Sequence, residues 1–203
     1  MGQKNCPRRQ NCRWVGECQM NTPIFFVEMP YVNELEVEGK WNTLFSYLIA
    51  AWSKQKNDLD LTLRLIAECW LMLTFWKWID HSELNEADVQ NALTQAVKEG
   101  TNHFTGVPKY LCLVGFMINL FPYLFESAFE LSYFEIEHLG MEMMQKACIL
   151  DPENPVAKML FLGTKPLSDE NKRKKTAYRQ DQILHSFSGE SWPDRYFRQL
   201  LCG

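Results

Sequence analysis

The chain has 203 residues, enough for one domain with its own hydrophobic core. Its composition, 46% hydrophobic and 23% charged, excludes a disordered or collagen-like chain. The formal net charge of −4 argues against a dedicated nucleic-acid-binding protein.

Charge is distributed unevenly along the chain. Residues 1–22 and 171–203 carry net charges of +3 and +4, whereas residues 23–170 hold ten basic and twenty-one acidic side chains. An acidic body of this kind attracts basic partners at a distance and repels phosphate backbones. We therefore expect a basic protein as partner and no nucleic acid. An acidic surface that only prevents aggregation is the alternative.

The cysteines and the hydrophobic runs indicate the compartment. Four of the seven cysteines lie in apolar or helix-like surroundings without a pairing rhythm, as expected in a reducing compartment: Cys69, Cys112, Cys148 and Cys202. Met1–Met20 lacks the apolar stretch of a signal peptide, and the longest uncharged run, Tyr110–Phe125, is too short to span a membrane. We expect a cytoplasmic protein with no membrane contact, and the sequence leaves its oligomeric state open.

Residues 1–22 form a polar N-terminal arm, and we expect residues 23–203 to form a single helical domain. In the arm, Cys6, Cys12 and Cys18 recur every six residues without helical periodicity. Zinc ligands usually come in close pairs and in sets of four. The spacing therefore favours an incidental polar arm, with a metal site or oxidation-prone thiols as alternatives. We predict no metal and no cofactor.

A short β-prone segment precedes the helices. Pro23–Val27 is rich in apolar and aromatic residues, and Pro30 ends it. Further on, Glu34, Glu36 and Glu38 alternate with apolar residues, and this period of two predicts a half-buried strand with three carboxylates on its exposed face. A short acidic loop leading into the first helix is the alternative.

From Trp41 onward the apolar spacing predicts one helix after another. The segment 58–79 is apolar nearly all round and is expected to form the centre of the core. Gly100 is placed to end one helix, and Asn154-Pro155 to open another. The other predicted helices are 42–56, 82–99, 107–119, 122–138, 139–150, 168–185 and 191–201. We therefore predict an all-α fold, a multi-helix array of eight or nine helices arranged as helical hairpins.

One segment resembles a known repeat. Gly140, Met144, Ala147 and Pro152 stand at the small–large–Ala–Pro spacing that closes a tetratricopeptide repeat, and the resemblance covers about residues 124–157. It implies a helical hairpin in which a small residue lets two helices approach closely. As a function it implies a concave groove for a peptide or protein, without chemistry. Only one repeat is recognised, whereas a solenoid normally needs three.

Catalytic motifs are lacking. The sequence has no nucleophile elbow, no phosphate-binding glycine loop and no dinucleotide fingerprint. Its four histidines are widely scattered: His81, His103, His138 and His185. We predict that the chain is not an enzyme and has no catalytic residues. A helical enzyme, with a site assembled from residues that are distant in the sequence, is a third interpretation of the function, beside the two binding functions given below.

One predicted helix face suggests a binding site. On the helix expected from Pro122, three glutamates and a tyrosine fall within about 60° of one another on a helical wheel. Carboxylates four residues apart destabilise an isolated helix, so such a ridge makes sense where a basic surface docks against it. A solvated helix face is the alternative. The residues predicted to bind a partner are Glu126, Glu130, Tyr133, Glu137, Glu34, Glu36 and Glu38.

The general character of the chain, which is small, acidic and helical, resembles the immunity proteins that bacteria carry against nuclease toxins. The resemblance implies an inhibitor that covers or flanks the active site of a basic toxin through Glu126, Glu130 and Glu137. The alternative is a tetratricopeptide-like adaptor or chaperone that holds a peptide in a groove within residues 122–163. A salt titration separates the two, because binding led by charge weakens as ionic strength rises.

Overall fold

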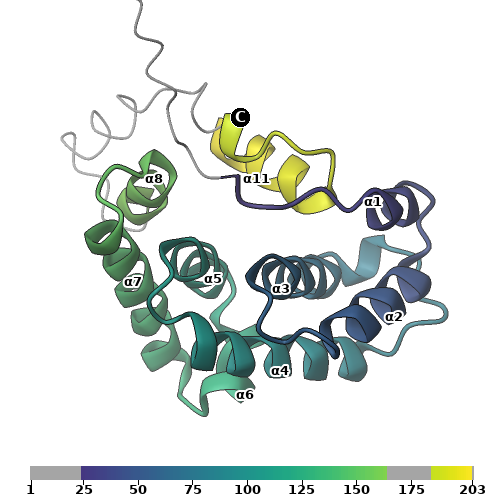
Figure 1. The fold of residues 1–203 in the computed structure, drawn as a ribbon. Helices are drawn as coiled ribbons and strands as arrows, with labels where there is room; N and C mark the ends of the chain where they lie inside the picture. The colour runs from purple at the N-terminus through teal and green to yellow at the C-terminus, as the bar shows by residue number, and fades with distance from the viewer. Residues whose placement is uncertain (1–23, 164–183, 203) are drawn as a thin grey trace, which may run out of the picture.

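The structure is a computed structural model that describes residues 24–163 and 184–202. Over these residues the chain is all-α, as predicted, and contains no strand. Two helices, α3 and α5, lie side by side in the interior, and the others surround them, with α11 covering the side left open by α7, α4 and α2 (Figure 1). None of the helices in this part of the chain is both long enough and apolar enough to cross a membrane.

The helices are α1 (Pro30–Val37), α2 (Trp41–Trp52), α3 (Leu59–Thr74), α4 (Glu86–Phe104), α5 (Pro108–Leu120), α6 (Glu126–Phe129), α7 (Tyr133–Leu150), α8 (Pro155–Gly163) and α11 (Trp192–Cys202). Two short 3₁₀ turns, η1 (Trp76–Trp78) and η2 (Pro122–Phe125), connect neighbouring helices. The N-terminal arm with Cys6, Cys12 and Cys18, and most of the helix predicted over 168–185, lie outside the described residues.

Helix α3 is the central core element, as the sequence predicts. Asp58 begins it, because its side chain accepts a hydrogen bond from the backbone N–H of Leu61 at 3.0 Å. Every residue from Leu61 to Leu73 is buried, since α2, α4, α5 and α11 pack on different sides of this helix. Trp70 is fully buried there, and burial of a large apolar side chain contributes about 2–3 kcal/mol to folding.

The acidic segment 30–37 is α1, so the prediction of a strand is wrong, and the alternative of a loop also fails. Pro30 occupies the first turn, where its fixed φ and missing N–H suit a helix. The buried side chains are Val32, Leu35 and Glu36. They stand at positions i, i+3 and i+4, which a helix brings to one face and a strand does not. The alternation of Glu with apolar residues is too short to outweigh this packing.

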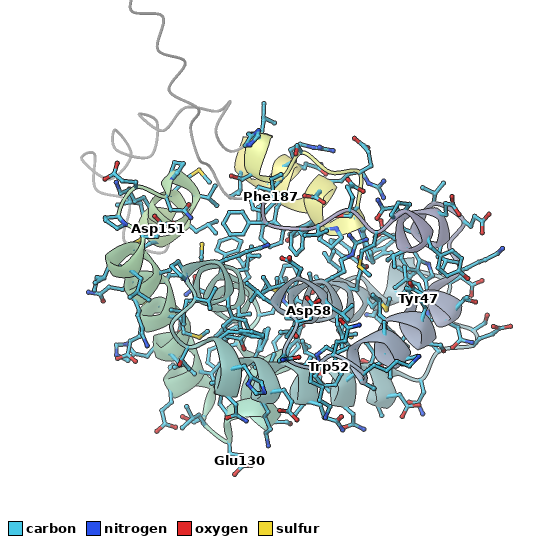
Figure 2. The ribbon with its side chains drawn as sticks, in the orientation of Figure 1. Tyr47, Trp52, Asp58, Glu130, Asp151 and Phe187 are labelled. Carbon is cyan, nitrogen blue, oxygen red and sulfur yellow. The ribbon has the colours of Figure 1, made fainter. Side chains whose placement is uncertain are left out.

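The described part of the β-prone segment, residues 24–27, is not a strand either. Phe25 and Phe26 are buried and pack on aromatic side chains from the C-terminal part of the chain. The rings of Phe25 and Phe187 stack with centroids 5.0 Å apart, and Phe187 stacks in turn on Phe197 of α11 at 5.1 Å. Phe187 lies beneath α11 (Figure 2). This aromatic stack joins the two ends of the described chain.

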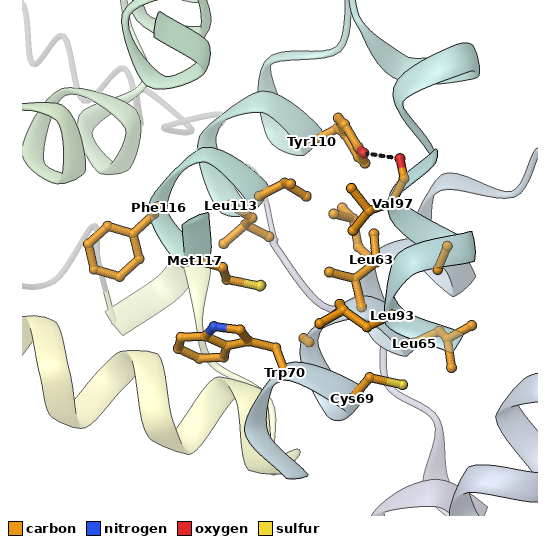
Figure 3. Packing of buried hydrophobic residues seen from close by; sticks show 14 of the residues in the cluster. Leu63, Leu65, Cys69, Trp70, Leu93, Val97, Tyr110, Leu113, Phe116 and Met117 are labelled. Atoms are coloured by element: carbon orange, nitrogen blue, oxygen red, sulfur yellow. Dashed lines mark hydrogen bonds between the residues drawn. The ribbon is translucent and has the colours of Figure 1, made fainter. Parts of the chain in front are cut away.

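Gly100 does not end a helix, contrary to the prediction, because α4 continues through it to Phe104. The glycine instead makes room for Tyr110 of α5: a Cβ added at Gly100 would lie 2.6 Å from Cε2 of that ring. The Tyr110 hydroxyl donates a hydrogen bond to the carbonyl oxygen of Val97 at 3.1 Å (Figure 3). The glycine is therefore explained by a close approach between α4 and α5.

Helix α7 runs without interruption from Tyr133 to Leu150, so the helix boundary predicted between 138 and 139 is wrong. It crosses α5 closely at two glycines. A Cβ added at Gly140 would lie 2.8 Å from the carbonyl oxygen of Gly115, and a Cβ added at Gly115 would lie 2.8 Å from the carbonyl oxygen of Gly140. The predicted start of the next helix is confirmed: the Asn154 side chain accepts hydrogen bonds from the first turn of α8, which begins at Pro155. The tetratricopeptide resemblance stays a prediction.

Candidate functional site

The helix predicted over 122–138 is broken, which changes the geometry of the predicted binding face. Helix α6 ends at Phe129, and the next residue, Glu130, has a left-handed backbone, with φ 57° and ψ 37°, that turns the chain away from the helix axis. Helix α7 then begins with a capping box, in which the backbone N–H of Ser132 donates to the Glu135 carboxylate at 2.9 Å and the Ser132 hydroxyl oxygen accepts from the backbone N–H of Glu135. The prediction that one helix carries all four partner-binding residues is therefore wrong.

The break still leaves the predicted residues on the surface, around one turn of the chain. We call this surface the α6–α7 ridge and define it by Glu126, Glu130, Leu131, Tyr133, Phe134 and Glu137. The side chain of Glu130 is 81% exposed at the outer edge of the molecule (Figure 2), where it pairs with Lys98 of α4 at 3.1 Å. Glu126 and Glu137 are half-buried.

Two neighbouring aromatic side chains are exposed on the ridge. Tyr133 is 45% exposed and Phe134 is 79% exposed, and their rings meet edge to face with centroids 5.7 Å apart. Leu131 is also exposed. Sequence reasoning missed Phe134, because only the tyrosine falls on the helical wheel of the unbroken helix. The capping sequence from Ser132 to Glu135 was the signal that places both rings on the first turn of α7.

Not every carboxylate near the ridge is free to bind. Hydrogen bonds from Ser132 lower the pKa of Glu135, whose charge serves the start of α7. Further along α7, Glu142 lies 3.2 Å from the ring of His138. The free charge of the ridge therefore rests mainly on Glu126 and Glu137, with Glu130 shared with Lys98.

An apolar hollow of about 200 Å³ lies next to the ridge, between α4, α5, α6 and α7. Phe129, Leu139 and Met143 form much of its apolar lining, and Lys146 lies at the same hollow. It is smaller than the about 300–1,000 Å³ pockets that hold whole small-molecule ligands. The hollow has the dimensions to receive an anchoring side chain from a docked protein.

The second predicted surface, on α1, is only partly available. Glu34 and Glu38 are exposed, and Glu38 pairs with Lys40 at 2.8 Å. Glu36 is buried, so the prediction that it lies on a shared exposed face is wrong. Its carboxylate accepts hydrogen bonds from the Arg64 guanidinium of α3 and from the backbone N–H of Trp192, the first residue of α11.

Glu36 belongs to a buried ionic cluster that we define as Glu36, Arg64, Glu68 and Asp194. Arg64 donates through Nε to Glu68 at 2.8 Å, and both side chains are at most 1% exposed. Burial raises the pKa of Glu68 well above its usual range; Arg64 opposes the rise, while the nearby Glu36 adds to it. Burial likewise raises the pKa of Asp194 to about 6.

The buried cluster joins three helices. Its side chains come from α1, α3 and α11, and the side chains of Glu36, Arg64 and Glu68 have almost no contact with solvent. Within residues 24–163 and 184–202, no group of three histidine, cysteine or acidic side chains is arranged to hold a metal ion. Cys69 and Cys112 are buried, and burial raises the pKa of both thiols. These groups lie in the interior of the fold that presents the ridge.

The fold and the ridge define an all-α protein with an exposed surface that is both acidic and aromatic. Comparison of the chain with protein-family models, with curated proteins and with solved structures gives no match.

Proposed function

We propose that this chain is a non-enzymatic binding protein that recognises a basic protein through the α6–α7 ridge. The observation that carries the proposal is the exposed pair Tyr133 and Phe134, set among the carboxylates of Glu126, Glu130 and Glu137. Aromatic side chains are enriched at the energetic centres of protein interfaces. An exposed pair of them, flanked by charges of one sign, suits a partner of the opposite sign.

The charge of the whole described chain supports the same partner. Residues 24–163 and 184–202 contain twenty-one acidic and eleven basic side chains. A net excess of ten negative charges attracts a basic protein before contact and raises the rate of association. We propose, as the most specific form of this function, an immunity protein that binds and neutralises a basic nuclease toxin.

The alternative function, a groove that holds an extended peptide within residues 122–163, has less support. The hollow in this region has a volume of about 200 Å³, which suits one anchoring side chain better than a peptide.

The experiment that tests the proposed function is capture of partners from lysate of the source cell at low salt and at 0.5 M salt, followed by mass spectrometry and affinity measurement. We expect one basic protein, bound stoichiometrically and released by salt. Phe134→Ala is expected to weaken its binding by at least about 2 kcal/mol, the size of an interface hot spot. Glu130→Lys should slow its association.

Two matched variants serve as controls. Ile149→Ala removes another exposed apolar side chain of α7, at the far end of that helix, and Glu153→Lys reverses another exposed charge. Both are expected to bind as the wild type does. A partner that binds as tightly in 0.5 M salt as at low salt, and that binds Phe134→Ala as tightly as the wild type, would contradict the proposed function.

A further inference from the structure

A groove lies between two helices that are distant in the sequence, α2 and α4. Both pack on α3 and leave between them an open channel of about 550 Å³. Asn42 at the start of α2 donates to Glu83, just before α4, at 3.4 Å, and Lys56 beyond α2 contacts Glu99 in α4 at 3.2 Å. The two helices therefore run in the same direction. The lining residues run from Phe45 to Ala50 on α2 and from Asp88 to Gln95 on α4, which gives the groove a length of about 10 Å.

Half of the side chains that line the groove are apolar, and the others are polar: Ser46, Asp88, Asn91 and Gln95. Phe45 and Ile49 of α2 and Ala92 of α4 belong to, or pack against, the hydrophobic core, and they also line the groove. Ala50 is exposed on the α2 side. These small and apolar side chains leave space for apolar groups from outside, which is how a helix docks into a groove, through residues at i, i+3 or i+4, and i+7.

The two ends of the groove differ in charge. Asp88 of α4 lines one end, and a polar recess of about 260 Å³ beside Asn42 at the same end is lined by Glu38, Asp80 and Glu83. The cation in this recess, Lys40, is already paired with Glu38.

At the opposite end, Lys56 contacts Glu99 and lies over the ring of Trp52, 5.1 Å from its centroid. An occupant whose positive charge is concentrated near Asp88 complements this distribution.

We propose that the α2/α4 groove binds an amphipathic helix of the basic partner, with apolar side chains on Phe45, Ile49 and Ala92 and with lysine or arginine beside Asp88. The basic character of the partner rests on the proposed function. The length of the groove fits about two turns of helix, the distance from i to i+7. A helix fits better than an added strand, because the described chain has no sheet edge to extend.

The groove and the α6–α7 ridge lie on opposite sides of one helix, α4. On the side of α4 facing the ridge, Gln90 donates to the carbonyl oxygen of Leu124 at 2.8 Å, and Lys98 pairs with Glu130. Figure 1 shows α2, α4 and α6 along the same edge of the molecule. Because a helix with its side chains is about 10–12 Å across, one partner can contact both surfaces.

The test uses a display library of 14-residue helical peptides, randomised on one face and selected against the full chain. We expect enriched peptides with apolar residues at i, i+3 or i+4, and i+7, and with lysine or arginine toward one end. Labelled copies of these peptides are then titrated against variants by fluorescence anisotropy. Ala50→Trp, which fills the groove from an exposed position, should weaken binding at least tenfold, and Asp88→Lys at least threefold.

The matched control is Gln145→Trp, which adds the same ring at an exposed position on α7 and should leave the affinity unchanged. Thermal unfolding of Ala50→Trp should match that of the wild type, which shows that the fold is intact. The proposal is overturned if the library yields no binder. It is also overturned if the enriched peptides are acidic, or if they bind Ala50→Trp as tightly as the wild type.

The groove and the proposed function fail in different ways. If a captured basic partner no longer binds Phe134→Ala but still binds Ala50→Trp, the groove proposal is wrong and the proposed function stands. If groove-dependent peptides are found but lysate yields no basic partner released by salt, the proposed function is wrong and the groove stands as a helix-binding site.

Discussion

The two glutamates that contact Arg64 are expected to respond very differently to the same substitution. Glu36 and Glu68 are both fully buried and both accept a hydrogen bond from the guanidinium. Burial raises the pKa of Glu68 and so disfavours its charged form, whereas Glu36 accepts hydrogen bonds from both the Arg64 guanidinium and the backbone N–H of Trp192. We predict that Glu36→Gln is strongly destabilising and that Glu68→Gln is mild.

The magnitude follows from what each substitution removes. Breaking a buried ion pair on one side costs about 3–5 kcal/mol, because an uncompensated charge stays buried. For Glu36→Gln we expect the lower limit, about 3 kcal/mol, since Glu68 still contacts Nε of Arg64. Glu68→Gln keeps an oxygen that can accept from Nε of Arg64, and burial already disfavours the charged form of Glu68, so this substitution should cost about 1 kcal/mol or less. The double variant should cost more than the sum of the two, because Arg64 then loses both of the carboxylates that contact it and only the more distant Asp194 of the cluster is left.

The assay is urea unfolding followed by far-ultraviolet circular dichroism at pH 7, with Glu34→Gln as the control. Glu34 is an exposed glutamate of the same helix, so its substitution should change the unfolding free energy by less than about 0.5 kcal/mol. Because Glu36 also accepts from the first N–H of α11, hydrogen exchange in α11 should rise in Glu36→Gln. Equal losses for Glu36→Gln and Glu68→Gln, or a larger loss for Glu68→Gln, would refute this account of the cluster.

Two further predictions concern Asp194 and the crossing of α5 with α7. Burial raises the pKa of Asp194 to about 6, from about 3.9 in the unfolded chain. Folding therefore disfavours the charged form of this side chain. The contribution of Asp194 to the unfolding free energy falls as pH rises from about 4 to 6. The gain in unfolding free energy from Asp194→Asn should therefore be larger at pH 7 than at pH 4, and a gain that is independent of pH would contradict this. Gly140→Ala should destabilise by about 1–3 kcal/mol, because its Cβ would meet the Gly115 carbonyl. Gly106→Ala, where no atom lies within 4 Å, should leave the thermal midpoint unchanged, and equal effects of the two substitutions would argue against the close crossing.

Local signals in the sequence determine the fold class and several helix starts. The apolar spacing of segment 58–79 predicts the central helix, and Asp58 marks its start. Asn154 and Pro155 likewise predict the start of α8. These predictions succeed because capping and the missing N–H of proline act within one helical turn, so that neighbouring residues alone decide them. The break before α7 also had a local signal, the capping sequence of Ser132 and Glu135, which the helical wheel overrode.

Tertiary structure alone decided which acidic side chains are available to a partner. Glu36 and Glu38 look equivalent in the sequence, yet Glu36 is buried because Arg64 of α3 and the start of α11 meet it. Gly100 looks like a helix end until the ring of Tyr110 packs against it. The α2/α4 groove has no sequence signal, because its two walls are about forty residues apart and only their packing on α3 places them together. Burial and pairing depend on residues far away along the chain, and a local pattern cannot report them.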